Sequence, residues 1–288
     1  MKNLYTNSKK GAYILNKKSF SGIFGNIFIV IYSLFILLPI YFVIITSLKT
    51  KADIILKPLV PSLKPVFQNF VDSFIQGHIA RASLNSFAIT SGTITISIIV
   101  TILLSFGIYK MFHKKVGTII YSFIMFGMMV APVGFVNLII LYQNMHLYNN
   151  LIGIIFNLAA NSIPFSVFLL VGQFRSIPKD LQDAATIDGC NEMQTLRYIF
   201  VPLSKPTITT ILILNLVMSW NNLLSPLLLI RSDKIRPITL SLLAFRGNYN
   251  IKYNLLFAGV IITAIPLLIL FIKFQKNFVE SLSGSMKG

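Results

Sequence analysis

Long runs without a charged residue constrain this sequence more than any other feature. Four runs of 20–26 residues, at 23–48, 84–109, 206–230 and 253–272, contain no Asp, Glu, Lys or Arg. A transmembrane helix needs about 20 mainly apolar residues, because the hydrocarbon core is about 30 Å thick and a helix rises about 1.5 Å per residue. These runs therefore predict four membrane-spanning helices.

A fifth charge-free run covers residues 116–174, which is 59 residues and too long for one span. The polar stretch 143–150 divides it into expected spans near 117–142 and 151–174. The predicted fold class is an all-α polytopic membrane protein with six transmembrane helices. We expect an N-terminal segment at 1–22, followed by one six-span domain at 23–288.

Composition excludes several other classes of protein. Hydrophobic residues make up 55% of the 288 residues and charged residues 11%, against about 25% charged in an average soluble domain. A soluble enzyme, a disordered chain and a disulfide-rich secreted scaffold are therefore excluded, and the single Cys190 rules out an internal disulfide. A net charge of +17 would favour nucleic acid in a soluble protein; here it favours basic cytoplasmic loops and no nucleic acid.

The distribution of Lys and Arg predicts the orientation. The first span is longer than the apolar core of a signal peptide and is followed by Lys49 and Lys51, so it is expected to stay in the membrane. Segments 1–22, 110–115, 175–205 and 273–288 hold 15 of the 25 basic residues, and segments 49–83, 143–150 and 231–252 hold 10. The prediction is a multi-pass protein of the cell membrane with both termini in the cytoplasm.

The sequence lacks the residues of a membrane protein that powers its own transport or that catalyses a reaction. None of the six runs contains an ionisable Asp, Glu, Lys or Arg of the kind that proton-driven carriers bury. There is no Walker A, H-E-x-x-H or G-x-S-x-G motif, and the three histidines lie far apart. We expect no catalytic and no metal-binding residue. Uphill transport would need energy from another polypeptide.

Uncharged polar residues do occur in the spans. The candidates for a solute path are Asn85, Asn215, Trp220, Asn221 and Asn222. Amides and hydroxyls can join membrane helices to one another, or they can line a path for a neutral, hydroxyl-rich solute. Both interpretations stay open at this stage.

The segment 175–205 predicts a short helix, a glycine turn and a second helix. Pro178 and Asp180 are signals for a helix start, and Gly189 suits a helix end because it accepts positive φ. One face of the first helix would carry residues at helical spacing, namely Leu181, Ala184, Ala185 and Asp188. Such an element either lies along the lipid headgroups or docks a soluble partner.

The same segment resembles the EAA loop of ATP-binding-cassette (ABC) importer permeases. The family pattern is E-A-A, three residues, G, nine residues, then I-x-L-P. This chain matches it with Asp183, Ala184, Ala185, Gly189 and Pro202, together with Asp188 before the glycine. Asp183 replaces the family glutamate and Val201 the leucine. The resemblance implies that this loop docks on the ATPase subunit.

Further motifs resemble the carbohydrate-uptake branch, and most of all its smaller, six-span, maltose-type permease subunit. The match covers roughly residues 24–288 and includes Asn85-Ser86, Ala131-Pro132, Ile177-Pro178, Trp220-Asn221, Ile265-Pro266 and the Gly284-Ser285-Met286-Lys287-Gly288 tail. The family commonly has Trp-Asn-Asp, whereas Asn222 is the third residue here.

The resemblance implies a transport subunit for a sugar or related polyhydroxy solute, without a catalytic site of its own. Its implied partners are a second permease chain in a heterodimer, an ATPase dimer that holds ATP and Mg, an extracytoplasmic solute-binding protein and membrane lipid. A permease for a peptide, amino acid or polyamine is the alternative; a non-ABC carrier or membrane enzyme is less favoured. The basic segments 49–83 and 231–252 would face outward, where they either dock the binding protein or face solvent and headgroups.

Overall fold

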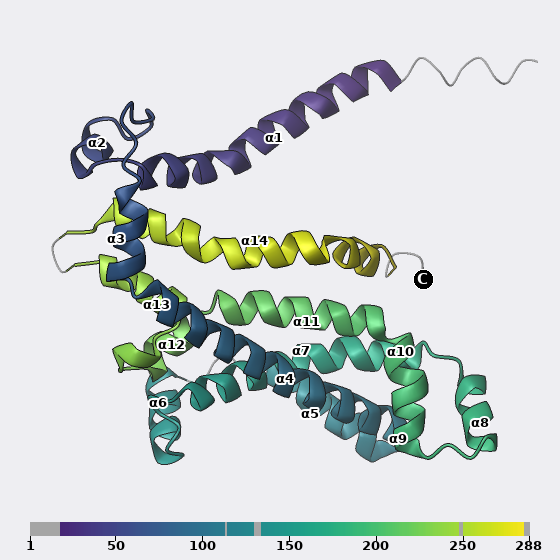
Figure 1. Ribbon diagram of the computed structural model, residues 1–288. Helices are drawn as coiled ribbons and strands as arrows, with labels where there is room; N and C mark the ends of the chain where they lie inside the picture. Colours follow the sequence, from purple (N-terminus) through teal and green to yellow (C-terminus); the bar gives the residue numbers. More distant parts are fainter. Residues whose placement is uncertain (1–17, 113, 130–133, 248–249, 285–288) are drawn as a thin grey trace, which may run out of the picture.

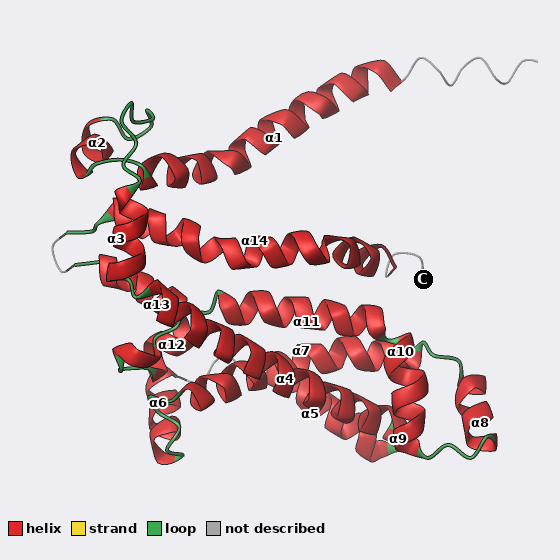
Figure 2. Ribbon diagram, viewed as in Figure 1, coloured by secondary structure: helices red, strands yellow, loops and turns green. Residues whose placement is uncertain are grey.

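The protein is built from helices, as the sequence predicts. The structure, a computed structural model, describes residues 18–112, 114–129, 134–247 and 250–284. Residues 1–17, Ala131-Pro132 and residues 285–288 of the expected tail lie outside the described residues. Within the described part there is no named strand, and one isolated bridge joins Arg246 to Ile251. Figure 2 shows the helices and their connecting loops.

Long helices cross the molecule, and the first of them splays away from the others over most of its length (Figure 1). The longest are α1 (Lys18–Ser47), α4 (Ile79–Met111), α7 (Leu151–Arg175) and α14 (Tyr253–Gly284). The shorter ones are α2 (Lys51–Leu56), α3 (Gln68–Gln76), α5 (Lys115–Met129), α6 (Phe135–Asn144), α8 (Lys179–Ile187), α9 (Glu192–Thr195), η1 (Leu196–Phe200), α10 (Val201–Leu203), α11 (Lys205–Trp220), α12 (Leu224–Leu229), η2 (Asp233–Ile235), α13 (Ile238–Ser241) and η3 (Leu242–Phe245).

Four of the expected spans are long apolar helices. They are Gly25–Ser47, Ile79–Met111, Leu151–Arg175 and Tyr253–Lys273 among the described residues. The expected span 117–142 is divided into α5 and α6, with residues 130–133 between them outside the description. α5 has 15 residues, about 22 Å of helix, which is short for a membrane.

The prediction of one uninterrupted span over 206–230 is wrong. α11 ends at Trp220, and α12 begins at Leu224. The Asn222 side chain accepts a hydrogen bond from the Ser225 N–H (2.9 Å), while its carbonyl accepts one from the Thr239 hydroxyl (2.8 Å). The bond to Ser225 is local and competes with helix continuation, as asparagine side chains often do, whereas the bond from Thr239 ties the break to α13.

α4 is the central helix of the described fold. It packs along α7 and also contacts α11, α5 and α13. Its buried face is a row of small hydroxyl residues at helical spacing: Ser86, Thr90, Thr93, Ser97, Thr101 and Ser105. Small residues let membrane helices approach closely. α4 therefore forms a tightly packed unit with α7, and its two ends reach opposite ends of the molecule.

Candidate functional site

The short helix α8 begins and ends as the sequence predicts. Its first turn follows Pro178 and contains Asp180. At its end the Cys190 N–H donates to the Ala185 carbonyl (2.9 Å) and the Gly189 N–H to the Thr186 carbonyl (3.1 Å). This pair of bonds is the Schellman arrangement. It places Gly189 at φ +79, a conformation that costs other residues free energy.

The second arm of the loop starts at once after this turn. Asn191 and Gln194 form a reciprocal capping box at the start of α9. A wide π-type turn, η1, follows, in which the Val201 N–H reaches back to the Leu196 carbonyl. Pro202 then lacks an N–H and would crowd the carbonyl four residues earlier in a regular helix. The wider turn accommodates the proline without ending the arm.

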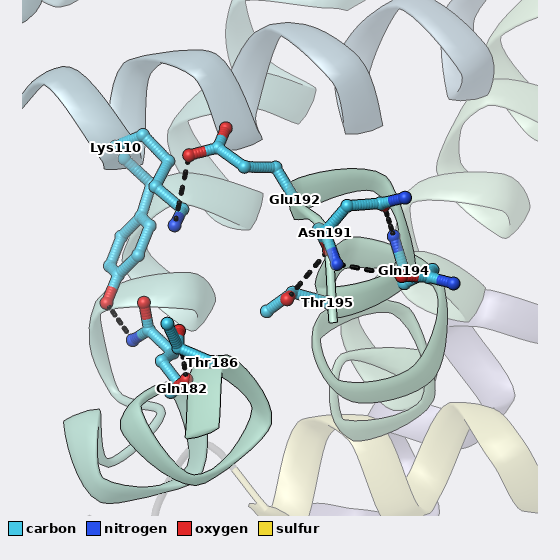
Figure 3. A network of polar contacts seen from close by, with 8 residues as sticks. Lys110, Gln182, Thr186, Asn191, Glu192, Gln194 and Thr195 are labelled. Atoms are coloured by element: carbon cyan, nitrogen blue, oxygen red, sulfur yellow. Dashed lines mark hydrogen bonds and ion pairs between the residues drawn. The ribbon is translucent and has the colours of Figure 1, made fainter. Parts of the chain in front are cut away.

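Two polar contacts fasten both arms of the loop to the last turn of α4. The Gln182 side-chain amide on α8 donates to the Tyr109 hydroxyl. Lys110 lies 3.5 Å from the Glu192 carboxylate on α9. Figure 3 shows Lys110 facing Glu192 and, beside it, Gln182 on the neighbouring arm. Sequence reasoning missed this pairing, because nothing in a single sequence relates residues this far apart.

An aromatic cluster lies beneath these contacts. Phe106 and Tyr109 of α4, Phe174 of α7 and Phe200 of η1 have ring centroids 5.0–6.4 Å apart, mostly edge to face. Phe174 and Phe200 are fully buried. Each such aromatic pair adds about 0.5–1.5 kcal/mol beyond area burial. The base of the loop is thus anchored in the helix bundle, while its tip projects away from it (Figure 1).

The tip exposes apolar and acidic side chains together. Ile187 is 85% exposed and Leu181 43% exposed. Asp183, Ala184 and Asp188 are exposed beside them. We call these five residues the α8 face. Sequence reasoning missed Ile187, although its apolar side chain next to Asp188 was a visible signal.

Ala185 differs from the expected face. It is 6% exposed and packs against the chain itself, so it does not share an exposed surface with Leu181, Ala184 and Asp188. The reason is the attachment of α8: Gln182 and Ala185, three residues apart, lie on the side that is held against α4. Ala185 is thus buried within this chain and is not part of the surface offered to a partner.

A pocket that combines amide and hydroxyl groups with an apolar wall lies between α7 and α11, and we call it the polar pocket for the groups that it offers for hydrogen bonding. Asn215 donates to the Ser97 hydroxyl (3.0 Å), and Ser97 shares a hydrogen bond with Ser162 (2.8 Å). Two adjoining cavities of 270 and 90 Å³ are both lined by Asn161, Ser162 and Asn215, and Asn222 lines the smaller one. The structure thus brings two sequence-predicted residues together. It adds Asn161 and Ser162, which the sequence signalled as adjacent polar residues inside a charge-free run.

The other predicted path residues lie elsewhere. Trp220 and Asn221 line a separate cavity of 510 Å³ between α11 and α14. Trp220 is 7% exposed and packs in an apolar cluster with Ile79, Ala82 and Ile238. These contacts with α4 and α13 account for Trp220 at this position by packing.

Asn85 is not part of either cavity. Its side-chain amide donates to the carbonyls of Lys234 and Arg236, both at 3.0 Å. Its two donors are used to hold a loop, which is a structural role at the end of α4 opposite the α8 face. Among the described residues, no group of three or more His, Cys, Asp or Glu could hold a metal ion.

The family model of the "binding-protein-dependent transport system inner membrane component" matches residues 97–283. This range includes the whole loop and the polar pocket. The chain therefore belongs to this family, and it is a membrane-spanning permease subunit of an ABC importer.

Curated relatives cover nearly the whole chain. The chain is 32% identical to the probable ABC transporter permease protein YurM of Bacillus subtilis (strain 168), over 91% of this chain and 87% of that protein. It is 29% identical to the arabinooligosaccharides transport system permease protein AraQ of the same organism, over 91% and 94%. It is 26% identical to the diacetylchitobiose uptake system permease protein NgcG of Streptomyces coelicolor, over 88% and 85%.

A solved structure shares the fold. A chain of a bacterial ABC transporter involved in the import of alginate superposes with a TM-score of 0.77, at 22% identity, over 96% of this chain and 99% of that chain. A second match, with a TM-score of 0.64 and 17% identity over 89% and 95%, comes from an alginate transporter in complex with its pentasaccharide-bound periplasmic protein.

Proposed function

We propose that this chain is one half of the permease of an importer for a sugar or related polyhydroxy solute, and that it has no catalytic site of its own. The observation that carries the proposal is a pocket without a charged residue, into whose largely apolar wall Asn161, Ser162 and Asn215 bring amide and hydroxyl groups. Amides and hydroxyls bind neutral hydroxyl groups without the cost of desolvating a buried charge. The substrates named for AraQ and NgcG support the same solute class.

The pocket lies on only one chain and opens at its surface, since Asn161 is exposed. A second permease subunit would complete the path from the other side in a heterodimer. Asn215 and Asn222 then contribute to the path, whereas Trp220 supports it by packing α11 and Asn221 ends that helix. The domain at 23–288 would work as one body.

The loop at 175–205 transmits energy from an ATPase dimer, which binds ATP and Mg. The α8 face would enter the ATPase surface, with Ile187 and Leu181 buried there and Asp183, Asp188 and Gly189 around them. ATP binding would draw the loops of the two permease chains together and rock the helices. The attachment to α4 supports this role, because α4 also carries Ser97, about 18 Å away along the helix axis.

An uptake experiment tests the solute class. The complete importer in proteoliposomes, with ATP inside and its binding protein outside, is given a panel of sugars, peptides, amino acids and polyamines. Uptake of a sugar alone is expected, and Asn161→Leu should raise its KM. The matched control is Asn150→Leu, a helix cap outside the pocket. Uptake of a peptide, amino acid or polyamine instead would refute the proposed solute class.

A labelling experiment tests the orientation. In the proposed topology both termini and residues 178–202 are cytoplasmic, and 231–252 is extracytoplasmic. On a Cys190→Ser background, an impermeant thiol reagent added to intact cells should label cysteines placed at 231–252. It should reach those at 178–202 only after permeabilisation. Labelling at 178–202 in intact cells would overturn the orientation.

A further inference from the structure

Positive charge gathers at the end of the molecule opposite the α8 face. Segments 49–83 and 231–252 together contain ten Lys and Arg but only three Asp and no Glu. Three of the basic residues, Arg231, Lys234 and Arg236, follow one another in a single loop at 231–236. Such a surplus raises the local concentration of an acidic partner and steers its approach.

One side of this loop is fixed by Asn149. The Asn149 side-chain oxygen accepts the backbone N–H groups of Arg231 and Ser232, both at 2.9 Å. Its own N–H donates to the Leu229 carbonyl (2.8 Å). Asn149 adopts φ +54 to do so, a conformation that asparagine tolerates better than most residues.

The other side is fixed by the start of α4. Asn85 holds the carbonyls of Lys234 and Arg236, and the Ser86 hydroxyl accepts the Ile238 N–H (2.8 Å). A surface loop that only faces solvent does not require so many hydrogen bonds to the rest of the protein. The loop therefore presents its basic side chains from a rigid backbone, which lowers the entropy cost of binding.

A pocket of 230 Å³ opens where this loop meets the junction of α3 and α4. The polar and charged residues that line it are Gln76, His78, Arg81, Asp233, Arg236 and Ser241. The junction is tight, because a Cβ on Gly77 would lie 2.8 Å from the Ser73 carbonyl oxygen, and His78 follows at φ +47. The wall that carries Arg81 is thus fixed in place too.

The pocket has guanidinium groups with N–H donors that are free to bind an anion. Arg236 places Nη2 2.7 Å from the Asp233 carboxylate, but its buried Nε has no hydrogen-bond partner among the described residues. Arg81 is exposed and forms no hydrogen bond or ion pair with any residue in the described ranges. The pocket wall thus carries two guanidinium groups and one carboxylate, which pairs with Arg236 only. Guanidinium donors are shaped to bind carboxylates in pairs of hydrogen bonds.

We propose that this pocket receives a carboxylate side chain, Asp or Glu, of the extracytoplasmic solute-binding protein. The inference rests on the proposed function and orientation, and it deepens them by naming the contact. The partner's carboxylate would lie between Arg81 and Arg236. Asn85 and Asn149 act as positioning residues, because they hold the loop that presents Arg236.

The test is a binding titration of the complete importer, in lipid nanodiscs, with the purified solute-binding protein of the same system. Arg81→Glu should weaken Kd by roughly tenfold or more and flatten its dependence on salt concentration. Arg81 makes no contact that holds the fold, so assembly should be normal. Lys64→Glu is the matched control: it makes the same change of charge on the same segment, outside the pocket, and should change Kd much less.

A second variant separates shape from charge. Asn85→Leu keeps every charge but removes the clamp, so Kd should weaken while the dependence on salt stays as in the wild type. Attraction by overall charge alone predicts no effect of Asn85→Leu and equal effects of Arg81→Glu and Lys64→Glu. That result would overturn the proposal.

Three other outcomes are decisive. The wild type and Arg81→Glu are also compared in nanodiscs of phosphatidylglycerol and of phosphatidylcholine. If Arg81→Glu has the Kd of the wild type in phosphatidylcholine but lacks a difference in Kd that the wild type shows between the two lipids, the pocket holds a lipid phosphate and the proposal is wrong. If the wild-type importer itself shows neither binding nor uptake with its binding protein, the proposed function fails instead. Reversal of an acidic residue of the binding protein that rescues Arg81→Glu would establish the pair.

Discussion

The two ends of α4 hold their loops by different means. At Tyr109 and Lys110 the loop is attached through side chains and a buried aromatic cluster, and its tip exposes Ile187 among acids. At Asn85 and Ser86 the loop is attached through its own backbone groups, and it exposes Arg and Lys. Side-chain anchoring lets a whole element move with the bundle, whereas backbone anchoring fixes the shape of one loop.

The surfaces also differ in the partner that they suit. Residues 178–202 contain four acidic and two basic residues, and the outward segments contain three acidic and ten basic residues. An exposed isoleucine offers area for burial against a partner, about 1.5–3 kcal/mol when fully buried. Exposed guanidinium groups offer specificity and steering more than raw affinity. One end is therefore suited to tight docking, and the other to transient docking.

The largest effect is expected from Ile187→Asp. The change should nearly abolish co-purification of the ATPase, because it removes the most exposed apolar group of the α8 face and would bury a charge without a partner. Leu63→Asp is the matched control, since Leu63 is 99% exposed at the other end. Normal ATPase binding by Ile187→Asp would show that the α8 face does not dock.

Gly189→Val should reduce ATPase binding by roughly tenfold, because a left-handed backbone costs about 1–2 kcal/mol in a residue with a Cβ. No atom lies within 4 Å of a Cβ added at Gly189, so the effect comes from φ alone. Gly107→Val, also without a neighbour within 4 Å but at negative φ, is the control. Equal ATPase recovery from both variants would argue against a positioning role of the turn.

Tyr109→Phe should have a moderate effect on coupling. It keeps the ring contacts with Phe174 and Phe200 but removes the bond to Gln182, worth about 0.5–1.5 kcal/mol. ATPase binding should persist, while the amount of solute imported per ATP falls. Gln182→Met should give the same loss, and the double variant should be no worse than either single one. Tyr198→Phe, on the exposed side of the same loop, should behave as the wild type. Additive losses would mean that the two residues act separately.

Asn149→Gly should give the smallest effect, and only at the outward end. Glycine accepts the positive φ of this position, so the change removes the side-chain oxygen without adding strain. Hydrogen exchange at the amides of Arg231 and Ser232 should become faster by roughly tenfold, the equivalent of one lost hydrogen bond. Exchange at 185–195 should not change. Unchanged protection at 231–232 would show that the loop is held by other contacts.

Charge gaps and local signals were enough to predict much of this protein. The absence of charge over 20 or more residues predicts helices in a membrane, because unsatisfied backbone groups cannot enter lipid, and four of the expected spans are such helices among the described residues. The turn at Gly189 and the start of α8 depend on residues within a few positions, so the sequence alone predicts them. The same holds for the resemblance to the permease family, which starts from the short linear motif at 183–202 and is confirmed by the family model over residues 97–283.

Tertiary structure decided which polar residues work together. Asn85 and Asn215 are equivalent in sequence, since both are amides near small hydroxyl residues in charge-free runs. The fold assigns Asn85 to a loop 149–151 residues away and Asn215 to Ser97, 118 residues away. Likewise Ala184 and Ala185 are adjacent, yet one is exposed and the other buried, because α8 is held to α4 through Gln182. Composition and periodicity describe what a residue can do, and only the packing of distant helices determines which partner it meets.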